Sequence, residues 1–243
     1  NEELEKRKEE GYKSGDIIGK FGLERIYDQT VRGTDGGRQV EVDVAGKPVD
    51  NLGTKEPIAG NDLVLTIDAV IQVAAERAID QQLSAIGANA AAAVVMNPQT
   101  GEVLALVSRP SFDPNLFVNG ISTKDWKLIN DNPYHPMDNK AITGEYPPGS
   151  TFKIITTAAA LRTGKITTDA EVDAPDTITL PGTNHALENF GGESCGGSRT
   201  TFTYAFAESC NTPFAQLAMN VGEKELSKEA KNWGFDSDLS IPL

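Results

Sequence analysis

The stretch GEYPPGSTFKIITTAAALRTG, residues 144–164, decides the fold. Two prolines and Gly149 come directly before Ser150, and Lys153 follows three positions later. Because residues i and i+3 share one face of a helix, we expect the serine hydroxyl and the lysine amine to lie side by side. The prolines resist helix formation and glycine can adopt unusual backbone angles, so the turn can fix Ser150 at the start of a helix.

The residues after Ser150 predict a buried helix that ends near Leu161, with Gly164 where a C-terminal cap belongs. Apolar residues cover this helix nearly all round, which is typical of a buried helix. A lysine with its ordinary pKa of about 10.4 is protonated, and it acts as a base only where burial or nearby cations lower that pKa. The surroundings of Lys153 therefore favour a serine nucleophile with a lysine base. The alternative is a capping serine and a solvated lysine, since this spacing alone arises by chance about once in such a chain.

A second polar group, Ser209-Cys210-Asn211, separates two predicted helices at 201–208 and 213–222. A tight connection between helices can direct polar side chains into a cleft. Alternatively, Asn211 or Thr212 caps a helix that starts at Pro213, a residue suited to the first helical position.

The remaining sequence predicts a mixed α/β chain. Residues 1–60 are charged and glycine-rich and indicate a small appended domain, with an alternating strand at 38–46. A short strand near residue 62 and an amphipathic helix follow, with Thr66 or Asp68 as N-cap and an end near Gly87. Residues 90–110 predict a hairpin that turns at 97–101. A short helix at 124–130 lies in a surface excursion, and 166–197 is predicted to be irregular.

Composition excludes several functions. With 35 acidic and 22 basic residues the net charge is −13, which disfavours nucleic acid as a partner. No apolar run reaches the roughly 18 residues of a membrane helix. His135 and His185 are the two histidines, and neither has ligand spacing to another histidine or to a CxxC pair, so we expect no metal site.

Ser-x-x-Lys followed by Ser-x-Asn matches two of three elements that mark penicillin-binding proteins and serine β-lactamases. YPPGSTFKIITTAAAL (146–161) and AESCNTPFAQLA (207–218) resemble the first two active-site motifs of class B penicillin-binding proteins, the peptidoglycan D,D-transpeptidases. The resemblance implies a penicillin-binding transpeptidase or serine β-lactamase-like fold of mixed α/β class, an antiparallel sheet with helices on both faces. It further implies that residues 1–60 end a non-catalytic pedestal domain and that 61–243 form the N-terminal portion of the transpeptidase domain.

The resemblance also implies roles for individual residues. Ser150 would attack the penultimate D-Ala carbonyl of a stem peptide, and Lys153 would be its base. Ser209 would relay a proton to the leaving amine, and Asn211 would hold the substrate amide and Lys153. No cofactor is implied.

The resemblance implies peptidoglycan stem peptides and β-lactam antibiotics as ligands, and elongation or division proteins of the cell wall as partners. It places the protein on the outer face of the bacterial cytoplasmic membrane, anchored by an N-terminal transmembrane helix that is not in this chain. Disulfides persist in that compartment, so Cys195 and Cys210 are expected to be bonded. Cys210 could instead be a small buried thiol.

One departure from the family pattern matters. The third motif, Lys-Thr-Gly on an edge strand, is expected beyond Leu243, so we expect an incomplete transpeptidase domain that lacks half of the oxyanion hole. Residues 162–164 (Arg-Thr-Gly) match it in two letters but are better explained as a helix terminus. The alternatives are a class D β-lactamase or β-lactam sensor, which usually carries Ser-x-Val as its second motif, and a non-catalytic scaffold fragment.

Overall fold

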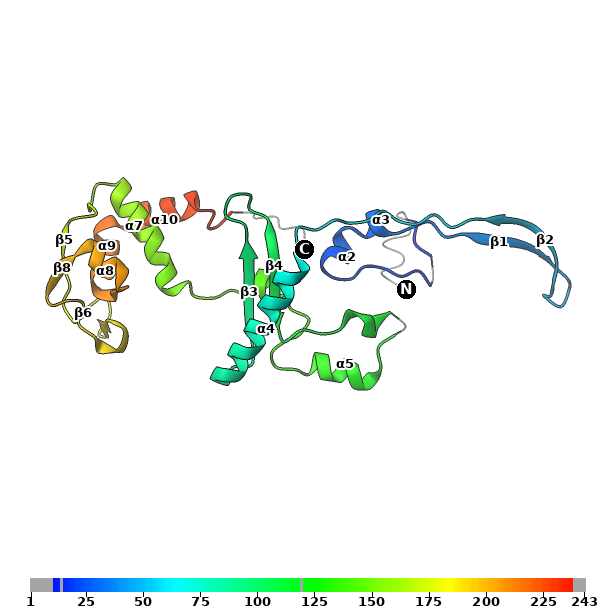
Figure 1. Cartoon of the computed structure of the whole chain (residues 1–243), viewed down its shortest axis with the longest axis horizontal. Coiled ribbons are helices and arrows are strands. Elements are labelled where there is room, and N and C mark those ends of the chain that lie inside the picture. The colour runs from blue at the N-terminus through cyan, green and yellow to red at the C-terminus, as the bar shows by residue number, and fades with distance from the viewer. Residues whose placement is uncertain (1–10, 14, 119, 238–243) are drawn as a thin grey trace. The chain divides into compact units, whose positions relative to one another are not determined.

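The computed structural model describes residues 11–13, 15–118 and 120–237. The chain forms two compact units that divide between Glu145 and Tyr146. All four sheets in the described residues are two-stranded and antiparallel (Figure 1). The predicted mixed class with antiparallel pairing is confirmed. The resemblance also implies a single larger sheet with helices on both of its faces. The two-stranded sheets described here do not test that part, which stays a prediction.

The first unit begins with two short helices and a long hairpin. These elements are α2 (Gly22–Ile26), α3 (Asp28–Val31), β1 (Gly37–Val42) and β2 (Pro48–Lys55). The sequence predicted a strand that continues to Gly46, but β1 ends at Val42. The Asp43 side chain accepts the backbone N–H groups of Ala45 and Lys47, which closes a turn there instead.

Helix α4 (Ala69–Ile86) has the ends that its sequence predicted. Asp68 Oδ1 accepts the backbone N–H groups of Val70 and Ile71 at 2.8 and 3.0 Å, as an N-cap does. Gly87 ends the helix in the left-handed region, with φ 67°.

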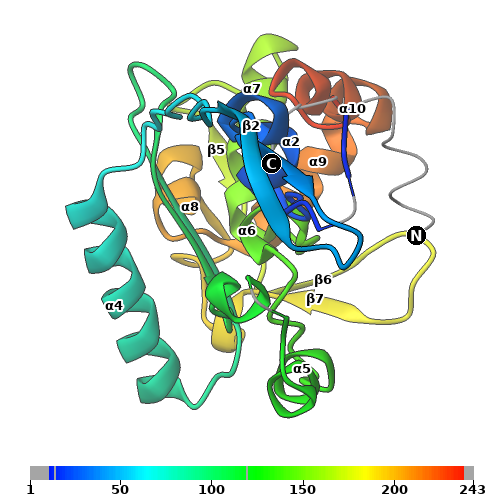
Figure 2. The same ribbon diagram turned by 90° about the vertical axis from the view of Figure 1, so that its right-hand side faces the viewer.

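The predicted hairpin is also confirmed, as β3 (Ala91–Met96) and β4 (Val103–Arg109). Asn97 Oδ1 accepts the N–H groups of Gln99 and Thr100 in the turn. Ala105 and Val107 alternate along β4 on its buried face. Figures 1 and 2 both show α4 lying along this hairpin.

The short strand predicted near residue 62 is wrong, because residues 61–67 contain no strand. This part of the chain meets the outer edge of β4 through scattered bonds rather than a ladder. Thr66 Oγ1 donates to Val103 O, and Asp68 N–H donates to Leu104 O. Gln72, on α4, then completes the edge, since its side-chain amide donates to Leu106 O and accepts Leu106 N–H. The side chain of one helical residue thus replaces a strand neighbour.

The described residues of the first unit end with three short helical elements. They are η2 (Pro114–Phe117), α5 (Thr123–Asn130) and α6 (Lys140–Thr143). The second of them, α5, agrees closely with the helix predicted at 124–130. Across the part of the chain that the structure describes, no helix is long and apolar enough to span a bilayer.

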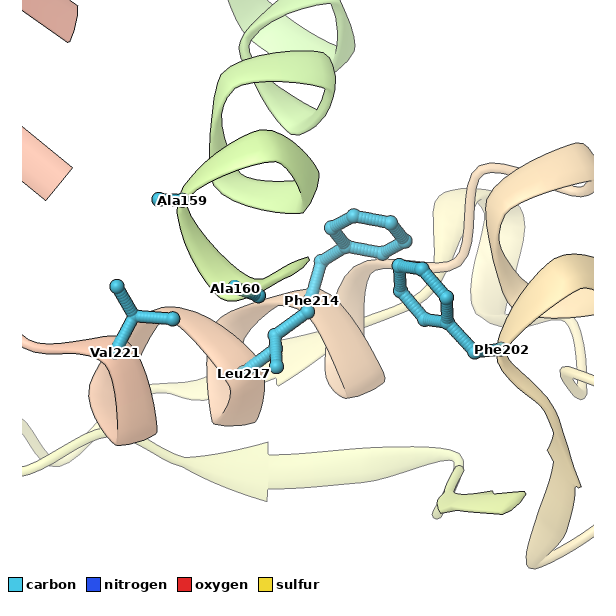
Figure 3. Close-up of a cluster of buried hydrophobic side chains, with 6 residues drawn as sticks. All are labelled: Ala159, Ala160, Phe202, Phe214, Leu217 and Val221. Carbon is cyan, nitrogen blue, oxygen red and sulfur yellow. The ribbon is translucent and has the colours of Figure 1, made fainter. Parts of the chain in front are cut away.

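The second unit packs four helices and short strands around an aromatic core. Its elements are η3 (Gly149–Phe152), α7 (Lys153–Arg162), β5 (Glu171–Asp173), β6 (Thr177–Thr179), β7 (Ala186–Glu188), η4 (Phe190–Gly192), β8 (Arg199–Thr201), α8 (Phe202–Ala207), α9 (Asn211–Val221) and α10 (Glu223–Asn232). Figure 3 shows the Phe214 ring of α9 between Ala160 of α7 and Phe202, at the start of α8. The ring centroids of Phe202 and Phe214 are 5.6 Å apart.

Three predictions for this unit need correction. The segment 166–197 is not wholly irregular, because β5 pairs with β8 and β6 with β7. The helix predicted from Ser150 begins instead with the 3₁₀ turn η3, and α7 proper starts at Lys153. This helix is not buried all round either: Ile154 is 47% exposed and Leu161 is 41% exposed, while its opposite face packs on α9 and α10.

The Arg-Thr-Gly at 162–164 is a helix terminus, as expected. Arg162 is the last residue of α7, and Gly164 is left-handed with φ 66°. Gly164 N–H bonds Leu161 O, and Lys165 N–H bonds Ala160 O, the two hydrogen bonds of a Schellman cap.

Candidate active site

Ser150 lies in η3, one turn before α7. Gly149 enters this turn with φ +56°, a conformation that favours glycine, and Lys153 N–H then bonds Ser150 O. The serine is exposed. Among the described residues its hydroxyl has no hydrogen-bond partner, so the structure does not show the expected contact between Ser150 and Lys153.

Lys153 instead reaches the connection between α8 and α9. Its Nζ donates to Asn211 Oδ1 at 2.9 Å, to Ser209 Oγ at 3.1 Å and to the Ser209 carbonyl oxygen. An ammonium group has three N–H donors, and these three acceptors match them. The structure therefore brings together three of the four residues that the sequence singled out, across more than 50 positions of chain.

Burial lowers the pKa of the Lys153 ammonium below its ordinary value. The side chain is half-buried, and its Nζ lies 5.5 Å from the ring centroid of the buried Phe214. Removing a charged amine from water favours its neutral form, which is the form that accepts a proton. This is the direction that the sequence predicted for a lysine base, although the helix is only partly buried.

Ser209 has a backbone conformation that is unusual for its residue type, with φ +54°. It follows the end of α8 in a Schellman cap, in which Ser209 N–H bonds Phe206 O and Cys210 N–H bonds Ala205 O. Glycine usually occupies this position, because a β-carbon disfavours the left-handed region. Such strain is common where a side chain serves a site. Here it aims both the hydroxyl and the carbonyl of Ser209 at Lys153.

Asn211 is the first residue of α9, two positions before the start that the sequence predicted at Pro213. Neither Asn211 nor Thr212 is the N-cap, so that alternative is wrong. Both backbone N–H groups donate to the side chain of Asn189, at 2.8 and 3.2 Å. Asn189 was not predicted as a site residue, because no local spacing in the sequence links it to α9.

Cys195 and Cys210 are joined by a disulfide in the structure, with Cα atoms 6.0 Å apart. Cys210 is the middle residue of Ser209-Cys210-Asn211, so the bond ties the glycine-rich loop 191–197 to this motif. The two histidines lie in different units, at His135 and His185. In the described ranges no three His, Cys, Asp or Glu side chains form a group that could hold a metal ion.

Comparison with known proteins identifies the family of the chain. The family model "Penicillin binding protein transpeptidase domain" matches residues 91–243. The chain belongs to the penicillin-binding protein transpeptidase family. A second model, "Penicillin-binding Protein dimerisation domain", matches residues 1–65 of this penicillin-binding protein. The resemblance to class B penicillin-binding proteins is therefore confirmed, and the domain boundary near residue 60 stays a prediction.

Curated relatives of this penicillin-binding protein are named peptidoglycan D,D-transpeptidases. MrdA of Acinetobacter baumannii is 35% identical over 243 residues, which cover 100% of this chain and 35% of the relative. PbpA of Mycobacterium tuberculosis is 41% identical over 219 residues, which cover 88% of this chain and 43% of the relative. The chain thus spans roughly two fifths of the length of the curated relatives it matches.

Solved structures show the same family. The imipenem acyl-enzyme complex of penicillin-binding protein A from M. tuberculosis matches with a TM-score of 0.68 and 42% identity, covering 74% of this chain and 42% of that one. A structure of a peptidoglycan synthase complex that coordinates polymerization and crosslinking matches with a TM-score of 0.79 and 32% identity, covering 94% of this chain and 41% of that one.

Proposed function

We propose that the complete protein is a peptidoglycan D,D-transpeptidase that uses Ser150 as its nucleophile. The observation that carries this proposal is the convergence of Ser209 Oγ and Asn211 Oδ1 on Lys153 Nζ, one helical turn after Ser150. The relatives named as D,D-transpeptidases support it, as does a solved neighbour captured as a β-lactam acyl-enzyme.

The acylation step follows from these residues. Neutral Lys153 accepts the Ser150 hydroxyl proton while Ser150 Oγ bonds to the carbonyl carbon of the penultimate D-Ala. The tetrahedral oxyanion collapses, the C–N bond breaks, and the terminal D-alanine nitrogen receives a proton through Ser209 Oγ. The Ser209 hydroxyl can do this because it can accept from the ammonium and donate onward.

Deacylation uses the same groups in reverse. An amine from a second stem peptide attacks the Ser150 ester, loses a proton toward Lys153 and takes the acyl group, which restores the serine hydroxyl. Asn211 would hold the substrate amide, and its Oδ1 keeps the lysine in place between the two steps. A β-lactam would follow the first step only: its ring opens, no leaving group departs, and the adduct persists.

Incubation with benzylpenicillin followed by intact mass spectrometry tests the proposal. The full-length protein should gain one persistent adduct, and Ser150→Ala should abolish it. Thr151→Ala is the matched control, because it removes the neighbouring hydroxyl, which bonds Pro148 O, and should keep the adduct. Rapid release of hydrolysed penicillin would instead support the β-lactamase alternative, and the absence of any adduct would support a scaffold.

We propose further that the protein acts on the outer face of the bacterial cytoplasmic membrane, held there by an N-terminal anchor. The disulfide between Cys195 and Cys210 supports this location, because disulfides persist outside the reducing cytosol. Elongation or division proteins of the cell wall are the proposed partners. Labelling of intact cells with a membrane-impermeant maleimide after reduction would test the location.

A further inference from the structure

The start of α9 lacks a cap of its own. The first N–H groups of a helix have no partner within the helix, and a side chain at the N-cap normally accepts one of them. Cys210 occupies the N-cap position of α9, but its side chain makes no capping bond and its sulfur is in the disulfide. The acceptor comes instead from Asn189, 22 positions before Asn211.

This cap is shielded from water. Asn189 is 7% exposed and Thr212 is fully buried. The Oδ1 atom of Asn189 accepts Asn211 N–H at 2.8 Å and Thr212 N–H at 3.2 Å. The Thr212 hydroxyl donates to Pro175 O at 2.7 Å, which holds the same turn from another side. Water therefore cannot easily replace the Asn189 oxygen if it is removed.

The residue before Asn189 holds the Asn211 side chain. Asn211 Nδ2 donates to Glu188 O at 2.9 Å, which turns Oδ1 of the same amide toward Lys153 Nζ, also at 2.9 Å. Two consecutive residues thus fix Asn211 at two points, its backbone N–H and its side-chain amide. Together they set the direction of the oxygen that contacts Lys153.

The unpaired side-chain nitrogen of Asn189 indicates that this residue does more than cap the helix. Within the described residues, the buried Nδ2 of Asn189 has no hydrogen-bond partner. An aspartate would accept the same two N–H groups, would favour the positive end of the helix dipole and would leave no buried donor unpaired. It would also place a negative charge beside Asn211, the residue that contacts Lys153, and so oppose loss of the lysine proton. A neutral amide caps the helix without that effect.

We infer that Asn189 is a positioning residue of the active site, whose side-chain oxygen caps α9 and thereby holds Asn211 against Lys153. The role in catalysis rests on the proposed function, whereas the role in holding α9 does not.

Amide hydrogen exchange in the full-length protein tests the structural part. Asn189→Ala should lower the protection of the Asn211 and Thr212 amides, while Asn189→Asp should preserve it. Asp68→Ala is the matched control, because Asp68 also accepts two N–H groups at a helix start, on α4. This control should deprotect Val70 and Ile71 only. Unchanged protection of Asn211 and Thr212 in Asn189→Ala would overturn the inference.

Acylation by benzylpenicillin tests the catalytic part. At a temperature where all variants are folded, Asn189→Ala should acylate on the order of tenfold more slowly than the wild type. Asp68→Ala should acylate at the wild-type rate. Asn189→Asp should keep the wild-type melting temperature, but the pH at half-maximal acylation should rise by roughly half a unit to one unit, because its carboxylate favours protonated Lys153.

These measurements separate the two proposals. If the wild type forms no adduct, the proposed function fails, and amide exchange alone decides whether Asn189 holds α9. If the wild type is acylated but Asn189→Ala matches its rate, or Asn189→Asp leaves the pH profile unchanged, the positioning role is overturned. A folded Asn189→Asp variant keeps the test decisive even where Asn189→Ala does not fold.

Discussion

Lys153 Nζ lies 3.1 Å from Ser209 Oγ, and the backbone that carries this serine is left-handed, with φ +54°. Lys153 is the first residue of α7 and Ser209 follows the end of α8, so the contact joins two helices of the second unit. The contact depends on a helix cap that would be less strained with glycine. Local stability and the chemistry of the site therefore oppose each other at this position.

The first prediction concerns pH. Because burial lowers the pKa of Lys153, acylation should rise with pH through a midpoint below the ordinary lysine value of about 10.4. The sign follows from the role of a base, which must be neutral to accept the Ser150 proton. Stopped-flow acylation with a chromogenic cephalosporin across pH measures the midpoint, and a midpoint at or above 10.4 would contradict the assignment.

Lys153→Arg is the matched variant for this profile. Arginine keeps the positive charge but stays protonated, so acylation should fall on the order of 10²-fold or more at every pH. If Lys153→Arg kept the wild-type rate, the residue would act only through its charge.

A second prediction uses the strained backbone of Ser209. Ser209→Ala and Ser209→Gly both remove the hydroxyl that contacts Lys153, so both should lower acylation by on the order of 10²-fold. Glycine tolerates φ +54° and alanine does not, so the Gly variant should be more stable by about 1 kcal/mol. Denaturant unfolding of both variants gives this difference. Equal stabilities would show that the cap carries no strain.

The sequence predicted the elements whose signals are local. Asp68 and Gly87 bound α4 as standard caps, and the polar turn at 97–101 defines the hairpin. The spacing of Ser150 and Lys153 singled out both residues, although Ser150 lies in η3 rather than in α7 and, in the part of the chain that the structure describes, its hydroxyl makes no hydrogen bond to Lys153. Each of these features depends on residues only a few positions apart, where periodicity and capping preferences are informative.

The features that the sequence did not predict depend on distant partners. Gln72 completes the edge of β4 from 34 positions away, and Asn189 caps α9 from 22 positions away. Neither residue has a distinctive spacing, because its role is set by the tertiary fold. The helix start at Asn211 was missed for the same reason: its cap is not adjacent in sequence, and Pro213 suggested a later start.

A third prediction concerns the disulfide. Cys195 and Cys210 are 15 positions apart, and closing a loop of that size stabilises a fold by about 3 kcal/mol in chain-entropy estimates. Reduction should therefore lower the melting temperature of the wild type. The double variant Cys195→Ala and Cys210→Ala should melt at the lower temperature with or without reductant. A wild type that is insensitive to reductant, with free thiols detected by mass spectrometry, would mean that the bond does not form.

A fourth prediction compares two arginines of the second unit. Arg162 Nε lies 2.6 Å from Glu229 Oε2, and its Nη2 lies 2.8 Å from Glu225 Oε2, which joins the end of α7 to α10. Trp233 Nε1 also donates to Glu229, at 3.0 Å. Arg199 pairs with carboxylates at 3.4 and 3.6 Å but is mostly exposed, so it serves as the control. Arg162→Ala should lower the melting temperature clearly more than Arg199→Ala, because exposed pairs contribute little.

The same ion pairs give a pH dependence with a definite sign. Arg162 lowers the pKa of Glu229 and of Glu225 in the folded protein. A lowered carboxyl pKa adds stability above the unfolded value of about 4.3, and that stability is lost as pH falls through the folded value. The melting temperature of the wild type should therefore fall more steeply below pH 4.3 than that of Glu229→Gln, which has no carboxylate there to protonate. Parallel curves for the two proteins would show that the ion pair between Arg162 and Glu229 adds no stability, and the polar link between α7 and α10 would then rest on the pair between Arg162 and Glu225.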